Sequence, residues 1–231
     1  MEWKYTKEKP LRVFEAFAGY GSQSLALEYI GIPYEVVGIA EIDPAAIKAY
    51  MAIHGETKNY GDVSKIDWND VPDFDLLTWS SPCQDFSNAG LQKGGEEGSG
   101  TRSSLLWEVK RIIDVKRPKY LLTENVKALV SEKFRPGFLK FCEYLEDRGY
   151  VSFRQVLNSK DYGIPQNRER IFVVSILGDA WYNFPHPMEL KLRLRDLLEE
   201  EVDEKYYLDD LRVAEFVGNL DPEKKAMICK D

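Results

Sequence analysis

The chain has 231 residues, of which 44% are hydrophobic and 30% charged, so it can bury a sizeable core as one main domain of ordinary soluble composition. Its net charge is −8, from 31 basic and 39 acidic residues, which argues against nonspecific binding to nucleic acid. Three cysteines and two histidines, all widely spaced, predict neither a disulfide framework nor a metal site.

The apolar runs are short. One of the longest, Val173–Leu177, is far too short to span a bilayer. The amino terminus lacks the charged-then-apolar pattern of a secretory signal. We therefore expect no membrane association and a cytoplasmic location.

Strand-like and helical segments alternate from the start of the chain. An apolar run at 11–17 predicts a strand, and a helix is expected to follow, capped by Ser22 and stopped by Gly31. A second strand is predicted at 34–42. The pair Asp43-Pro44 is typical of the cap and first turn of another helix.

The same alternation continues to about residue 177. Further strands are expected at 74–79, 119–123, 151–157 and 170–177, with helices at 103–116 and 137–148. This order predicts an α/β fold with right-handed crossovers, in which a mostly parallel sheet is covered by helices on both faces in three layers. Ligands of such sheets bind outside the carboxyl ends of the strands.

After residue 184 the alternation stops. We therefore predict a boundary near residue 185, with one domain at 1–185 and a separate region at 186–231. Acidic residues crowd the stretch from 196 to 210, which indicates a solvated face or a linker.

A glycine turn separates the first strand from the first helix. Phe17, Gly19 and Gly21 lie in it, and glycines let a ligand approach the backbone at a helix N-terminus. A Gly-x-Gly pair alone also fits a plain tight turn, so this motif becomes informative only together with others.

Two acidic residues, Glu41 and Asp62, lie at the next two junctions along the chain. Glu41 lies about 20 residues beyond the glycine turn, a spacing suited to gripping the two hydroxyls of a ribose. Asp62 follows a third junction, where it is suited to accept from an adenine amino group, although an isolated aspartate there is equally typical of a turn. Together these acids suit an adenosyl ligand that has no phosphate to repel them.

Cys83 follows an apolar strand at the start of a glycine-rich, polar stretch from Asn88 to Gly100. A cysteine at the carboxyl edge of a buried strand faces a crevice, and its thiolate is a competent nucleophile. We interpret the stretch after it as a mobile lid. Glu124 ends another strand at the same edge, where burial favours its neutral, proton-donating form.

Two arginines enter the last strand. Arg168 and Arg170 alternate with Glu169 and so are expected to share a face. Forked guanidinium groups suit phosphate oxygens and can polarise a carbonyl.

In this order the motifs resemble the DNA (cytosine-5)-methyltransferase family of prokaryotes and phages. The resemblance covers roughly residues 11–190. It rests on Phe17-Ala18-Gly19-x-Gly21, Ser81-Pro82-Cys83-Gln84-x-Phe86-Ser87, Glu124-Asn125-Val126 and Tyr162-Gly163-Ile164-Pro165-Gln166-x-Arg168-x-Arg170.

The resemblance implies a Rossmann-like fold that uses S-adenosylmethionine, with double-stranded DNA as partner and a role in restriction-modification or phage DNA protection. It implies Cys83 as the nucleophile, assisted by Glu124, Arg168 and Arg170. It also implies that the cofactor pocket is lined by Phe17, Gly19, Gly21, Glu41, Ile42, Asp62, Val63, Pro82 and Leu105.

Members of this family continue through a target-recognition region and a final Gly-Asn-(Ser/Ala)-Val helix that completes the cofactor pocket. We expect both to be lacking here: Gly218-Asn219 is only a faint echo of that helix, and 186–231 is expected to be the start of a truncated recognition region or a linker. The recognised DNA sequence therefore stays unassigned.

Three alternatives remain. The chain is an active methyltransferase, alone or completed by a second polypeptide, or it is an inactive remnant that binds DNA or a partner. A nicotinamide or flavin oxidoreductase fits the glycine turn and Glu41 but leaves Cys83 and the arginines without a role. RNA as the substrate is also compatible with the motifs.

Overall fold

The computed structural model describes residues 5–80 and 108–218. In these residues six strands form one sheet in the order β2-β1-β3-β4-β6-β5. Strands β2, β1, β3 and β4 run parallel, and β6 is antiparallel to both of its neighbours. The strand bounds are β1 (Leu11–Ala16), β2 (Tyr34–Ala40), β3 (Leu76–Trp79), β4 (Tyr120–Val126), β5 (Tyr150–Asn158) and β6 (Glu169–Leu177).

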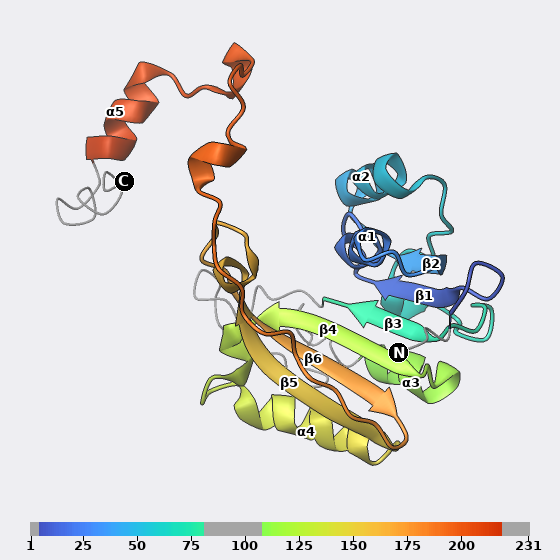
Figure 1. The fold of residues 1–231 in the computed structure, drawn as a ribbon. Coiled ribbons are helices and arrows are strands. Elements are labelled where there is room, and N and C mark those ends of the chain that lie inside the picture. The colour runs from blue at the N-terminus through green and yellow to red at the C-terminus, as the bar shows by residue number, and fades with distance from the viewer. Residues whose placement is uncertain (1–4, 81–107, 219–231) are drawn as a thin grey trace. The chain divides into compact units, whose positions relative to one another are not determined.

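Helices cover both faces of this sheet, as the sequence predicted. Figure 1 shows α1 (Ser22–Tyr29) and α2 (Pro44–His54) on one face, and α3 (Glu108–Lys116) and α4 (Arg135–Glu146) on the other. The α/β prediction with a mostly parallel sheet in three layers is confirmed.

The side chains of β1 show how the sheet separates two cores. Val13 packs with Leu11 and Leu76 in one buried cluster, which includes Leu27 of α1. Phe14 points to the opposite face and joins a larger cluster with side chains of α3 and α4. Because successive strand residues alternate between faces, Glu15 lies on the α1 and α2 side and is only 1% exposed.

The ends of α1 and α2 show which local signals set helix boundaries. The Asp43 side chain accepts hydrogen bonds from the amides of Ala45 and Ala46, which confirms the predicted cap of α2. Gly31 follows α1 with a φ of +70°, a conformation that glycine adopts without strain. The prediction that Ser22 caps α1 is wrong: the cap is Gly21, with φ 78°, and Ser22 is the first helical residue.

Strand β4 is longer than the sequence predicted. It continues to Val126, which pairs with Arg170 of β6. An antiparallel neighbour supplies hydrogen-bond partners at that end, and no local pattern in the sequence announces it. Glu124 therefore lies inside the strand, three residues before the 3₁₀ helix at Lys127–Val130.

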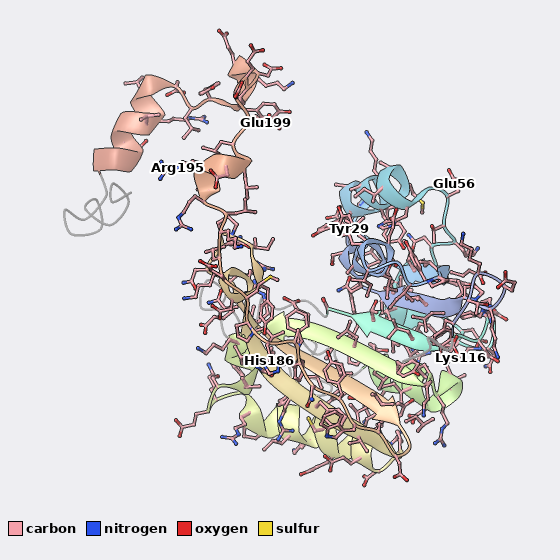
Figure 2. The ribbon with its side chains drawn as sticks, viewed as in Figure 1. Tyr29, Glu56, Lys116, His186, Arg195 and Glu199 are labelled. Carbon is pink, nitrogen blue, oxygen red and sulfur yellow. The ribbon has the colours of Figure 1, made fainter. Side chains whose placement is uncertain are left out.

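The chain divides into two compact units, Met1–Leu190 and Lys191–Asp231. The described part of the second unit contains short 3₁₀ turns and α5 (Asp210–Gly218). Every residue from Lys191 to Asp209 is exposed, and the side chains of this stretch, with Arg195 and Glu199 labelled, are drawn in Figure 2. Among the described residues, none of the helices is both long and apolar enough to cross a membrane.

Candidate active site

The predicted site residues that the structure describes gather at the carboxyl edge of the parallel strands. The glycine turn follows β1, Glu41 follows β2, and Glu124 lies near the end of β4. Trp79, the last residue of β3, pairs with Thr123 of β4, the residue directly before Glu124. This edge is where sheets of this kind bind ligands.

The glycine turn has an open side and a packed side. Phe17, Gly19 and Gly21 all have positive φ, at 54°, 58° and 78°. A Cβ at Gly19 would meet nothing within 4 Å, whereas a Cβ at Gly21 would lie 2.4 Å from the His54 ring and 2.6 Å from that of Tyr50. Gly19 thus leaves room for a ligand, and Gly21 allows α2 to pack against the turn.

A buried carboxyl group supports this turn from below. Tyr50 donates its hydroxyl hydrogen to Glu15 over 2.6 Å, and the amide of Ser24 in α1 donates to the same carboxyl over 3.3 Å. Burial raises the pKa of Glu15. The Nε2 atom of His54 lies 3.0 Å from the carbonyl oxygen of Tyr20, so α2 contacts the turn directly. Sequence analysis missed the roles of these residues.

Glu41 is bound mainly by backbone amides. Gly19 donates to its Oε2 atom over 2.9 Å, while Ile42 and Asp43 donate to Oε1 over 2.8 and 2.9 Å. An ionised carboxylate offers about four lone-pair sites, so about one stays available to a further donor. The bond from Gly19 ties this acid to the glycine turn across the sheet edge.

Ile42, Asp62 and Val63 lie in different environments. Ile42 is 68% exposed, an uncovered apolar side chain beside Glu41. Asp62 accepts from the amide and the hydroxyl of Ser64, over 3.0 and 2.8 Å, and these bonds lower its pKa. Val63 is 4% exposed and its side chain packs into the main core.

Asp62 therefore has one function that the structure shows and a second that stays a prediction. It caps the 3₁₀ helix at Val63–Lys65, as the turn interpretation expected. Its Oδ2 atom lies 3.3 Å from Nζ of Lys65, which is 81% exposed. At Oδ2, an adenine amino group would compete with this solvated ion pair.

On the other half of the edge, Glu124 forms an ion pair with Arg170. The Oε1 atom of Glu124 is 2.9 Å from Nε of Arg170, and each side chain is 22% exposed. This ion pair holds the Glu124 carboxyl group in a defined position. The forked guanidinium has further donors to offer to a third group.

Arg170 and its neighbour Glu169 point to opposite faces of β6, as successive residues of a strand do. Glu169 turns away from Arg170 and pairs with Lys127 at 2.9 Å. Arg168 is exposed and precedes β6, so it belongs to the turn and not to the strand. Its amide donates to the side chain of Asn158 over 3.0 Å, a contact that sequence analysis did not foresee.

Pro82, Cys83 and Leu105 lie outside the described residues. The chain leading to Cys83 is described as far as Ser80, which directly follows β3. Gln23 of α1 donates to the Ser80 hydroxyl over 3.5 Å. The last described residue before this motif therefore lies beside the helix that begins at the glycine turn.

Comparison with solved structures identifies this arrangement as a methyltransferase fold. The Dnmt2 methyltransferase of S. pombe matches with a TM-score of 0.74 at 25% identity, over 91% of this chain and 68% of that one. The methyltransferase EhMeth of Entamoeba histolytica matches with a TM-score of 0.76 at 21% identity, over 92% of this chain and 67% of that one, and supports the fold alone.

Sequence comparison places the chain in a family. The model for C-5 cytosine-specific DNA methylase matches residues 11–224. The type II methyltransferase M2.ScrFI of Lactococcus lactis subsp. cremoris is 42% identical over 89% of this chain and 72% of its own length. The chain belongs to the C-5 cytosine-specific DNA methylase family.

Other relatives come from phages and bacteria and are longer. The orphan methyltransferase M.Rho11sI of Bacillus phage rho11s is 37% identical over 93% of this chain but 49% of its own length. The type II methyltransferase M.NlaX of Neisseria lactamica is 38% identical over 86% of this chain and 63% of its own length. The chain thus spans from about half to almost three quarters of these three relatives.

The described residues fit the S-adenosylmethionine that this family uses. No described atom lies within 4 Å of a Cβ placed at Gly19. Glu41 keeps about one acceptor position, which suits a ribose hydroxyl, and Ile42 has an exposed apolar side chain that suits an adenine ring. These are the polar and apolar contacts that an adenosyl group needs.

Proposed function

We propose that the chain carries the cofactor-binding and catalytic part of a DNA (cytosine-5)-methyltransferase. The observation that carries the proposal is the common sheet edge: Glu41 bonded to Gly19, and Glu124 paired with Arg170, flank the strand that leads to Cys83. An acceptor for an adenosyl group and a carboxyl–guanidinium pair thus lie at one edge, where the strand that precedes the nucleophile motif also ends.

Phe17, Gly19, Gly21, Glu41, Ile42, Asp62, Val63, Pro82 and Leu105 would hold the cofactor. When bound, S-adenosylmethionine supplies an electrophilic methyl group. Glu41 would bind a ribose hydroxyl and Asp62 the adenine amino group. Because the Val63 side chain is buried in the core, that residue would contribute its backbone.

Cys83 would act as the nucleophile. Carbon 5 of cytosine is unreactive within an aromatic ring, and addition of the Cys83 thiolate to carbon 6 removes that aromaticity. Carbon 5 then becomes nucleophilic and can accept a methyl group. Loss of the proton from carbon 5 returns the electrons to the ring, and the bond between carbon 6 and sulfur breaks.

Glu124 and Arg170 would support the addition step. The Glu124 carboxyl group would interact with ring nitrogen 3, where hydrogen bonding stabilises the enamine. Arg170 fixes the carboxyl group by their 2.9 Å ion pair and can polarise the adjacent carbonyl of the base. Arg168, exposed in the preceding turn, would assist from the DNA side.

The substrate would be double-stranded DNA with the target cytosine turned out of the helix. Neither face of carbon 6 is accessible in a stacked duplex, so the base must leave the stack. The similarity to type II and orphan phage methyltransferases supports a role in restriction-modification or in protection of phage DNA.

A second candidate is a protein that needs further polypeptide for activity. Ten large apolar side chains in 191–213 are exposed, an unusual number for one short segment. Their positions are Leu192, Leu194, Leu197, Leu198, Val202, Tyr206, Tyr207, Leu208, Leu211 and Val213. Contact with a recognition region, in this chain or in a second one, would cover them.

A trapping experiment tests the proposal. The wild-type protein, incubated with S-adenosylmethionine and a 5-fluorocytosine duplex, should form a covalent adduct at Cys83, because fluorine blocks the release step. Cys83→Ser should abolish the adduct. Cys142→Ala is the matched control, because Cys142 is buried and burial raises the pKa of its thiol.

An adduct on any other side chain would reject Cys83 as the nucleophile. A folded wild-type protein that binds the cofactor but forms no adduct would favour the second candidate. Methyl transfer to RNA but not to DNA would assign the other nucleic acid as substrate.

A further inference from the structure

Asn59 lies between α2 and Gly61 and makes an unusually complete set of hydrogen bonds with its side chain. Its Oδ1 atom accepts from the amide of Glu41 over 3.2 Å and from the amide of Gly61 over 2.9 Å. Its Nδ2 atom donates to the carbonyl oxygen of Glu41 over 3.0 Å. The residue is half-buried, and no sequence motif draws attention to it.

The backbone around Asn59 runs along the free side of β2, which is the edge strand of the sheet. Ile39 and Asn59 form an isolated parallel bridge. The amide of Ile39 donates to Lys58 over 2.9 Å, and that of Tyr60 donates to Ile39 over 2.8 Å. The segment 58–60 thus pairs with β2 as a very short additional strand.

The side chain of Asn59 extends this pairing beyond the end of β2. The pairing of β1 with β2 ends at Ala40, one residue before Glu41. A carboxamide both accepts and donates, so Asn59 bonds to the Glu41 peptide as a neighbouring strand would. The same oxygen also binds the amide of Gly61, the residue before Asp62.

One side chain therefore connects the backbones of the two acids assigned to the adenosyl group. Glu41 is held on one side through its carboxylate by Gly19 and on the other through its peptide by Asn59. Asn59 also accepts from the Gly61 amide, and Gly61 directly precedes Asp62, which caps the next 3₁₀ helix. A shift of Asn59 would change the separation of Glu41 and Asp62.

We propose that Asn59 is a positioning residue of the cofactor site, which sets the separation between the ribose-binding Glu41 and the adenine-binding Asp62. The inference rests on the proposed function, because it takes those two acids as ligands of the adenosyl group. Aspartate cannot replace it, since it has no hydrogen to donate to the Glu41 carbonyl. Alanine would remove all three bonds.

S-adenosylhomocysteine, titrated calorimetrically into the intact protein, is the probe. Asn59→Ala should weaken its binding roughly tenfold, because Glu41 and Asp62 lose their common anchor. Asn59→Asp, which keeps the shape and two acceptor contacts, should weaken binding in the same direction. Asn69→Ala is the matched control, because the Asn69 side chain bonds to Asp67 in an exposed turn away from Glu41 and Gly61.

Two further measurements distinguish positioning from general destabilisation. In a Glu41→Ala background, the effect of Asn59→Ala should shrink to less than about threefold, because residues that act through one another are not additive. Hydrogen exchange at the amides of Glu41 and Gly61 should become faster in Asn59→Ala and unchanged in Asn69→Ala.

The possible results distinguish a failure of the proposed cofactor site from a failure of the role of Asn59. A folded wild-type protein that fails to bind S-adenosylhomocysteine would reject the proposed function and this inference with it. Wild-type affinity in both Asn59 variants, full additivity with Glu41→Ala, or unchanged exchange at Glu41 and Gly61 would reject the role of Asn59 while leaving the proposed function intact.

Discussion

Glu15 is a buried acid directly below the glycine turn, and its environment makes folding sensitive to pH. Its carboxyl group is 1% exposed and accepts from Tyr50 and Ser24. Burial raises its pKa above the usual value of 4.5. The folded state therefore binds the proton more tightly than the unfolded state, so the stabilising contribution is complete at low pH and is lost as the pH rises toward the folded-state pKa.

Replacement of Glu15 by glutamine tests whether the ionisation of Glu15 destabilises the fold as the pH rises. Glu15→Gln keeps a carbonyl acceptor for Tyr50 but cannot ionise, so its free energy of unfolding relative to wild type should increase from about pH 4.5 upward. Urea denaturation at pH 4.5 and pH 7.5 measures the difference. Glu56→Gln, at an exposed position, is the control. A constant difference across this range would contradict the assignment.

Gly21 illustrates a second constraint at the residue scale. A Cβ there would meet both His54 and Tyr50, whereas one at Gly31 would meet nothing within 4 Å, although both glycines have positive φ. Gly31→Ala should therefore cost only the conformational penalty, about 1 kcal/mol. Gly21→Ala should cost about 3 kcal/mol, because overpacking adds to that strain.

Chemical denaturation of the two glycine variants provides the comparison. Because the α2 contact also supports the turn, Gly21→Ala should in addition weaken binding of S-adenosylhomocysteine, while Gly31→Ala should leave it unchanged. Equal losses of stability in the two variants would show that α2 does not pack against the turn as described.

At the scale of elements, the pairing of β4 with β6 creates the contact between Glu124 and Arg170. Arg170→Ala should reduce methyl transfer to DNA about 100-fold, because the carboxyl group loses its fixed orientation. The matched control is Arg12→Ala, which removes another cross-strand ion pair, from Arg12 to Glu35 at 3.9 Å in the β1–β2 half of the sheet.

Exposed pairs of this kind contribute about 0–1 kcal/mol, so Arg12→Ala should leave both the rate and the melting temperature close to wild type. Initial rates with labelled S-adenosylmethionine measure the effect. A similar loss of activity in the two variants would indicate a general effect on the sheet and would contradict a specific role for Arg170.

The helices and strands show which features of the fold could be predicted from local sequence patterns. The alternation of strands and helices depends on short-range periodicity, so the order of β1 to β6 and the cap at Asp43 could be predicted. Glu41 was singled out because it follows a strand end, and it does follow β2, whereas Glu124, expected just after a strand, lies inside β4. The end of β4 was predicted three residues early, because its pairing with β6 connects segments about 45 residues apart in the chain.

The residues that sequence analysis missed share one property. Glu15, Tyr50 and Asn59 act through contacts formed only when separate segments pack together, at separations of 35 residues for Glu15 and Tyr50 and 18 for Asn59 and Glu41. Each fits an ordinary local pattern: a strand, an apolar helix face and a polar loop. Only their contacts in the folded structure show that they lie at the candidate site.

At the scale of the whole molecule, the two units differ in what holds them together. The first contains the sheet and its buried clusters, while every residue from Lys191 to Asp209 is exposed. Since stability in a domain comes from burial, the stretch at 191–209 should contribute little to unfolding of the first unit and should open locally at low cost.

Limited trypsin digestion tests this division. Bonds after Lys191, Arg193 and Arg195 should be cut much faster than bonds after Arg12 and Arg148, because a protease needs an opened segment and the first unit opens only by unfolding its sheet. Mass spectrometry identifies the cuts. After removal of the segment, the melting temperature should change by less than about 3 °C, and S-adenosylhomocysteine should still bind. Loss of cooperative unfolding on cleavage would instead show that this segment stabilises the first unit.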